Sequence, residues 1–189
     1  MNAWTRRDLE APTRHGFTGD DVLRMMSAGV LYEGGRFELI DGEIIDMPAE
    51  GDVHLSLKIS LNRFLARALP DAIALTPDGT LRLSESNWPE PDFYLFPAAM
   101  RVSEVRGPDL LLVIELSDST LAYDLRRKAE LYRRFGVREY WVADVKAGAT
   151  HVHHLGGAWP SRPVLFTDEL EASLIPALRL RLADFLPPS

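Results

Sequence analysis

The segment Leu110–Leu116 constrains the fold more than any other, because it reads as a strand that is apolar on both faces. Strands of this kind lie inside a sheet that is covered on both sides, as in α/β proteins. Glu115 lies near the end of this strand. Burying an ionised carboxylate costs several kcal/mol unless it is paired or bound to a metal. The segment therefore predicts a central strand and a buried acid with a partner.

A candidate partner lies on the helix expected over Leu121–Phe135, which Gly136 ends. At about 100° per residue from Leu121, Lys128 falls among a stripe of apolar residues that lie within roughly 40° of one direction. These residues are Leu121, Leu125, Tyr132 and Phe135. Asp124 lies on the flank of that stripe, one turn earlier. The Lys128 amine could instead reach solvent, or it could pair only with Asp124, which would stabilise the helix by about 0.3–0.5 kcal/mol. Its coincidence with Glu115 favours a site.

Length and composition predict one domain over residues 1–189, with residues 1–16 as a loose arm. Apolar runs fall short of the roughly 20 residues that span a bilayer, so no membrane association is expected. The first residues lack the apolar segment of a secretory signal, which favours a cytoplasmic protein. The absence of cysteine excludes disulfides, thiolate zinc sites and cysteine nucleophiles.

The net charge of −7 argues against loose, nonspecific binding of nucleic acid, which relies on lysine and arginine. It does not exclude a metal-dependent nuclease, because the metal ion partly neutralises clustered carboxylates.

The remaining pattern mixes strands with helices and predicts an α/β fold with a mixed sheet flanked by helices. Helix signals and strand signals alternate along the chain, and Asp41-Gly42 is a strong hairpin turn. The expected helices cover Thr18 to about Ala28 and Asp52–Ala68, and the expected strands are Arg36–Ile40, Glu43–Met47, Ala72–Leu75, Thr80–Leu83, Asp92–Phe96, Glu139–Asp144, Thr150–Leu155 and Ala177–Leu182.

Asp92 is a second candidate acid, because it opens a strand after the stiff segment Trp88–Pro91. Asp92 and Glu115 at the ends of neighbouring strands can grip one hard cation, Mg²⁺ or Mn²⁺, through oxygen ligands. A solvated acid at the sheet edge is the plainer interpretation of Asp92 alone. By contrast, Pro77-Asp78-Gly79 reads as a simple turn.

Together these pieces resemble the Uma2 family of restriction-endonuclease-like proteins, which have the PD-(D/E)XK nuclease fold. The resemblance covers roughly residues 17–145. It is carried by Phe37-Glu38-Leu39-Ile40-Asp41-Gly42-Glu43, His54, Pro91-Asp92, Val113-Ile114-Glu115-Leu116-Ser117-Asp118-Ser119-Thr120, Asp124, Lys128 and Phe135-Gly136-Val137-Arg138-Glu139-Tyr140-Trp141.

The resemblance implies roles for several of these residues. In the wider superfamily a lysine lies two residues after the glutamate, where this chain has Ser117. The resemblance implies that Lys128 is that lysine, moved to the next helix. It implies Glu38 as an additional acid and metal ligand, and His54 as a group that contacts metal or phosphate. From the residues alone, Glu38 could simply face solvent and His54 could be a core histidine.

The leading hypothesis is therefore a Mg²⁺- or Mn²⁺-dependent endonuclease acting on DNA, with Asp92, Glu115 and Glu38 holding the metal. Asp124 is expected to fix Lys128 rather than to ligate. One alternative is an inactive scaffold that keeps the nuclease fold, which Ser117 and the acidic balance favour. Another is a purely structural ion pair between Glu115 and Lys128. An open sheet of this size commonly pairs into a homodimer.

Two other clusters are weaker candidates. His151, His153 and His154 could bind zinc weakly, but no carboxylate or cysteine lies at a matching spacing, so an ordinary strand is the expectation. The pair Tyr140-Trp141 could stack on bases, although its place at the start of a strand favours the core.

Overall fold

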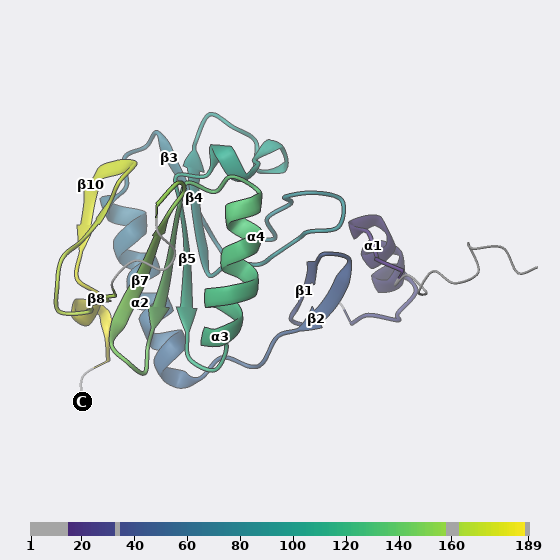
Figure 1. The fold of residues 1–189 in the computed structure, drawn as a ribbon, viewed down its shortest axis with the longest axis horizontal. Helices are drawn as coiled ribbons and strands as arrows, with labels where there is room; N and C mark the ends of the chain where they lie inside the picture. Colours follow the sequence, from purple (N-terminus) through teal and green to yellow (C-terminus); the bar gives the residue numbers. More distant parts are fainter. Residues whose placement is uncertain (1–14, 33–34, 158–162, 188–189) are drawn as a thin grey trace, which may run out of the picture.

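A six-stranded mixed sheet forms the centre of the protein in the computed structural model, which describes residues 15–32, 35–157 and 163–187 (Figure 1). Strands β5 and β6 pair in parallel, whereas the other neighbours pair antiparallel. The strand order is β3 (Ile73–Pro77), β4 (Phe93–Pro97), β5 (Leu112–Ser117), β6 (Glu139–Asp144), β7 (Ala149–His154) and β8 (Val164–Leu165). The predicted mixed sheet flanked by helices is confirmed.

Helices cover both faces of this sheet, and β5 is buried along its whole length. Alternate residues of a strand point to opposite faces. Leu112, Ile114 and Leu116 accordingly pack with α2 (Asp52–Ala68), whereas Val113 packs with α4 (Ala129–Arg134). Glu115 lies two residues after Val113 and therefore points to the same face of the sheet. The strand therefore directs its one carboxylate toward the helix that follows Lys128.

The entry to β5 depends on a close backbone approach at Gly107, which opens the short 3-10 helix Gly107–Asp109. A Cβ atom at Gly107 would lie 1.9 Å from the Phe135 carbonyl oxygen. We expect Gly107→Ala to lower the free energy of unfolding by about 1–3 kcal/mol, because backbone at the end of α4 must shift. Urea denaturation measures this change.

Gly16→Ala is the matched control for that substitution. Its Cβ would meet the Gly42 Cα at 3.6 Å, which is ordinary contact. We expect a change within about 0.5 kcal/mol there. Equal losses in the two variants would show that the contact with Phe135 is not the cause.

The N-terminal elements lie to one side of the main sheet (Figure 1). Helix α1 (Gly19–Ser27) begins with Thr18 as N-cap, as predicted. Strands β1 (Phe37–Ile40) and β2 (Glu43–Asp46) form the predicted hairpin around Asp41-Gly42, both of which have positive φ. Two backbone hydrogen bonds join Leu39 to Trp88, so the hairpin is tied to the chain just before Asp92.

Three expectations need correction. The segment Thr80–Leu83 is not a strand: it folds back on the following loop, where the Leu81 N–H bonds the carbonyl of Pro89, a residue without a donor of its own. The last expected strand is β10 (Ile175–Leu180), which pairs with β9 (Leu170–Ala172), and Leu182–Phe185 is a 3-10 helix.

The third correction concerns the helix expected over Leu121–Phe135. It consists of α3 (Leu121–Tyr123), a π-helical turn over Asp124–Lys128, and α4. The remaining elements agree with the prediction to within a few residues. Val102–Glu104 is another 3-10 turn. Within the described residues, none of the helices has the length and apolar character needed to cross a membrane.

Candidate functional site

The Lys128 side chain is fully buried, with 1% exposure, and its amine lies among acids. The Nζ atom is 2.7 Å from Glu38 Oε1 and 2.8 Å from Glu115 Oε1. Asp124 Oδ1 lies farther away, at 4.0 Å. Lys128 therefore neither reaches solvent nor pairs with Asp124 alone. The predicted meeting of Lys128 and Glu115 is present in the structure.

The π-helical turn explains how Asp124 and Lys128 both reach their places. Asp124 Oδ2 accepts hydrogen bonds from the Ser117 and Thr120 hydroxyls, each at 2.6 Å. These bonds tie the start of the turn to the end of β5. Such π-helical insertions are rare and often occur at functional sites. Ser117, at the position where the superfamily has lysine, therefore holds Asp124, which in turn lies beside Lys128.

Glu38 is buried and has partners at both carboxylate oxygens. Oε1 accepts from the Glu90 N–H at 2.7 Å in addition to Lys128, and Oε2 accepts from the Tyr123 hydroxyl at 3.1 Å. The solvent-facing alternative for Glu38 is wrong. Glu38 does not line the cleft described below, so its position is that of a partner for Lys128 rather than of an open metal ligand.

Asp92 is also buried, not solvated at an edge. Because Phe93 pairs with Ile114, Asp92 lies across from the end of β5. Its Oδ2 accepts from the Leu116 N–H at 2.7 Å, and its Oδ1 lies 3.2 Å from His54 Nε2 and 2.7 Å from Lys58 Nζ. Burial alone would raise the pKa of Asp92, but the hydrogen bond from His54 and the charge of Lys58 lower it to about 2.

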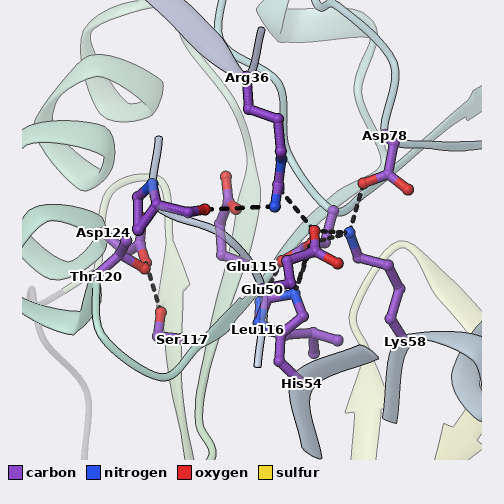
Figure 2. Close-up of polar contacts among 12 residues, drawn as sticks. Arg36, Glu50, His54, Lys58, Asp78, Glu115, Leu116, Ser117, Thr120 and Asp124 are labelled. Carbon is purple, nitrogen blue, oxygen red and sulfur yellow. Dashed lines mark hydrogen bonds and ion pairs between the residues drawn. The ribbon is translucent and has the colours of Figure 1, made fainter. Parts of the chain in front are cut away.

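Sequence analysis missed Glu50, Lys58 and Arg36 in this cluster, and it took Asp78 for part of a simple turn with no role in the site. Glu50 Oε1 lies 2.5 Å from Lys58 Nζ, 2.6 Å from the Arg36 guanidinium and 3.7 Å from His54 Nε2 (Figure 2). Asp78 Oδ1 lies 2.5 Å from the same lysine amine. One signal was available, because His54 and Lys58 lie four residues apart on one face of α2, whereas Glu50 precedes that helix. The turn at Asp78 gave no such signal.

A single cleft joins the two clusters. Glu50, His54 and Asp92 line one part of it, and Glu115, Asp124 and Lys128 line another. Burial raises the pKa of Glu115 well above its ordinary value, and Asp124, Asp92 and Glu38 add to that rise although Lys128 opposes it. Burial alone would lower the pKa of Lys128, but Glu115 and Glu38 hold it well above its usual value, so the amine stays charged.

The donor atoms in this cleft suit a hard divalent cation. Glu50, His54 and Asp92 offer ligand atoms that all lie within 4.8 Å of one another. Carboxylate oxygens with one imidazole are ligands for Mg²⁺ or Mn²⁺. The surplus of buried acids over cations provides the negative charge that such an ion needs. The residues present therefore fit a divalent metal.

The weaker candidates do not form sites. In the described part of the chain, three metal-binding side chains converge only at Glu50, His54 and Asp92, so the histidines at 151, 153 and 154 make no such group. His153 is buried and stacks on Tyr140, with ring centroids 5.6 Å apart. Tyr140 and Trp141 are buried as well, which confirms the expectation that they belong to the core.

Residues 20–183 match the sequence profile of the family described as "Uma2: Putative restriction endonuclease". The chain belongs to the Uma2 family. The resemblance seen in the sequence is thus confirmed, and it extends almost to the end of the chain. No curated protein matches this member of Uma2.

One solved structure supports the fold of this Uma2 member. A structure titled "putative nuclease belonging to DUF820", from Anabaena variabilis, is 14% identical, covers 89% of this chain and 97% of its own, and has a TM-score of 0.67. The type IIG restriction endonuclease BpuSI is 15% identical over 61% of this chain and 14% of its own, with a TM-score of 0.38. The fold of the chain is restriction-endonuclease-like.

Proposed function

We propose that this protein is a divalent-metal-dependent endonuclease that hydrolyses phosphodiester bonds in DNA. One observation carries the proposal: Asp92 and Glu115, from neighbouring strands, and the buried Lys128 line the same cleft. Membership of a family of restriction-endonuclease-like proteins supports a nucleic-acid substrate. The predicted homodimer and cytoplasmic location stay predictions.

We propose that Asp92 and Glu115 hold Mg²⁺ or Mn²⁺. Asp92 belongs to the converging group with Glu50 and His54, and Glu115 lines the same cleft without belonging to that group. Bound there, the ion would supply Lewis acidity toward the phosphodiester and a more acidic water. His54 contacts Asp92 and orients its carboxylate from the α2 side. The sequence also predicted Glu38 as a ligand. Because its oxygens already accept two hydrogen bonds and pair with Lys128, we propose instead that Glu38 positions the Lys128 amine.

Lys128 brings a fixed positive charge to the cleft. Its raised pKa keeps the amine protonated at neutral pH, so it can stabilise negative charge that develops on a phosphate. Glu38 and Glu115 hold the amine by direct contact, and Tyr123 holds Glu38. A charge that is held in advance requires no rearrangement during the reaction. Arg36 is half-exposed at the cleft and can contact the DNA backbone.

The test is cleavage of plasmid and duplex oligonucleotides with Mg²⁺ or Mn²⁺. We expect Asp92→Asn to lower the rate by more than about 100-fold, since even indirect partners of a catalytic metal contribute about 10- to 100-fold. Asp71→Asn, which changes an exposed aspartate before β3, is the matched control and should cleave like the wild type. Circular dichroism checks that both variants fold.

Cleavage that survives both EDTA and Asp92→Asn would refute the proposed mechanism. A folded wild type that binds Mn²⁺ but cleaves no nucleic acid would instead favour the inactive scaffold.

A further inference from the structure

Lys58 is a second buried lysine, and it does not line the cleft. It lies on α2, and its amine is within 2.5 Å of Glu50 Oε1, 2.5 Å of Asp78 Oδ1 and 2.7 Å of Asp92 Oδ1 (Figure 2). Three carboxylates thus surround one ammonium group. Because Lys58 lies behind the acids rather than in the cleft, its position suits a counter-charge for these acids and not a contact with substrate.

The acids that hold Lys58 are the same acids that could hold a metal. Glu50 and Asp92 belong to the group of three potential ligands with His54, and both contact the Lys58 amine. Burial alone would lower the pKa of Lys58, but the charge of Asp92 and the hydrogen bonds that the amine donates to Asp78 and Glu50 raise it above the ordinary value. A permanent positive charge therefore already lies against this group.

The formal charge of the two clusters limits how many ions can enter. Three cations, Arg36, Lys58 and Lys128, face six carboxylates, which leaves three negative charges in excess. The six acids are Glu38, Glu50, Asp78, Asp92, Glu115 and Asp124. One divalent ion would reduce the excess to a single charge, whereas two would give these nine groups a net positive charge. Without Lys58, the excess would match two divalent ions.

We propose that the Lys58 ammonium takes the place of a second divalent cation, so that the site binds one metal ion. In two-metal sites the ions lie about 3.5–4 Å apart and act together on one phosphate. Here Asp92 contacts the ammonium and is also a proposed metal ligand, so one carboxylate would serve both positive charges. This inference rests on the proposed function, because it takes Asp92 and Glu115 as metal ligands.

The stoichiometry of Mn²⁺ binding tests the proposal, by titration calorimetry and electron paramagnetic resonance on metal-free protein. We expect one ion per chain in the wild type and two in Lys58→Met, with the second bound below about 1 mM free Mn²⁺. Arg63→Met, an exposed cation on the same helix, should still bind one ion. A purely structural role of Lys58 would not add a binding site.

The possible results separate the two proposals. Two ions in the wild type, or one ion in Lys58→Met, would overturn the role of Lys58 and leave the proposed function standing. No binding to the wild type would overturn the proposed function itself, and this inference with it.

Loss of Lys58 leaves three acids without their shared cation, so Lys58→Met can be unfolded in the absence of metal. Far-UV circular dichroism during a Mn²⁺ titration covers that case. Folding that appears as Mn²⁺ is added supports the exchange of ammonium for metal. A variant that stays unfolded at every Mn²⁺ concentration overturns it.

Discussion

Replacing Lys128 by methionine is expected to lower the free energy of unfolding by about 3–5 kcal/mol, because the substitution leaves buried acids without their cation. Glu38 and Glu115 contact the Lys128 amine directly, and Asp124 lies at 4.0 Å. Methionine preserves most of the volume, so the loss reports charge rather than a cavity. Urea denaturation at pH 7 in EDTA measures it.

Lys146→Met is the matched control, because Lys146 is 71% exposed and pairs with Asp118 at the surface. We expect a change within about 1 kcal/mol there. The double variant Lys128→Met/Glu38→Gln should recover part of the loss, since it removes one of the unpaired acids. A single Lys128→Met variant as stable as the wild type would show that the acids do not need the amine.

The loss in free energy of unfolding caused by Lys128→Met should also become smaller as the pH falls from 7 toward 4. Burial raises the pKa of Glu115 even in the presence of the lysine. A carboxyl whose folded-state pKa is raised contributes its full stability below its unfolded pKa, about 4.3, and loses it as the pH rises through the folded value. Removing Lys128 raises the pKa of Glu115 further, so lowering the pH should stabilise the variant more than it stabilises the wild type.

Glu115→Gln is expected to change stability and activity in opposite directions. Cleavage and Mn²⁺ binding should fall by more than about 100-fold, because Glu115 is a proposed ligand. The free energy of unfolding of the metal-free protein should rise by about 1 kcal/mol or more at pH 7, since each raised pKa unit of Glu115 costs about 1.4 kcal/mol. Glutamine keeps an oxygen for Lys128, which also retains its contact with Glu38.

Glu130→Gln is the control, because this glutamate is exposed on α4. It should change neither quantity. If Glu115→Gln instead destabilised the protein by about 3–5 kcal/mol, Glu115 and Lys128 would be a structural ion pair and not part of a metal site.

Much of the fold and half of the site follow from local pattern. The apolar run Leu110–Leu116 predicts a buried central strand, and the helical stripe predicts that Lys128 points into the interior, because both depend on the period of one element. Glu115 and Lys128 lie only 13 positions apart, on consecutive elements. Asp92 follows from the pairing of neighbouring strands.

The cluster around Lys58 does not follow in the same way. Glu50 lies in a loop and Asp78 in a turn, where no periodicity tells which way a side chain points. Their shared lysine lies one position from the apolar residue Leu57, so a pattern search assigns it to the flank of α2. Only the packing of α2 against the sheet, near the end of β3 and the start of β4, brings these charges together. The strand expected at Thr80–Leu83 fails for a related reason, since its hydrogen bonds go to a loop.

The π-helical turn fixes the spacing between two anchors. Asp124 is fastened to Ser117 ahead of the turn, and Leu131 and Tyr132 are packed in the core beyond it. A π-helical turn holds one more residue than an ordinary turn, so deleting one residue between these anchors would restore α-helical winding while the anchors keep their places, and the residues inside the turn would lose theirs. The site therefore depends on the number of residues in this helix as much as on the identity of its acids. A variant with a shorter helix would no longer place the Lys128 amine between Glu38 and Glu115.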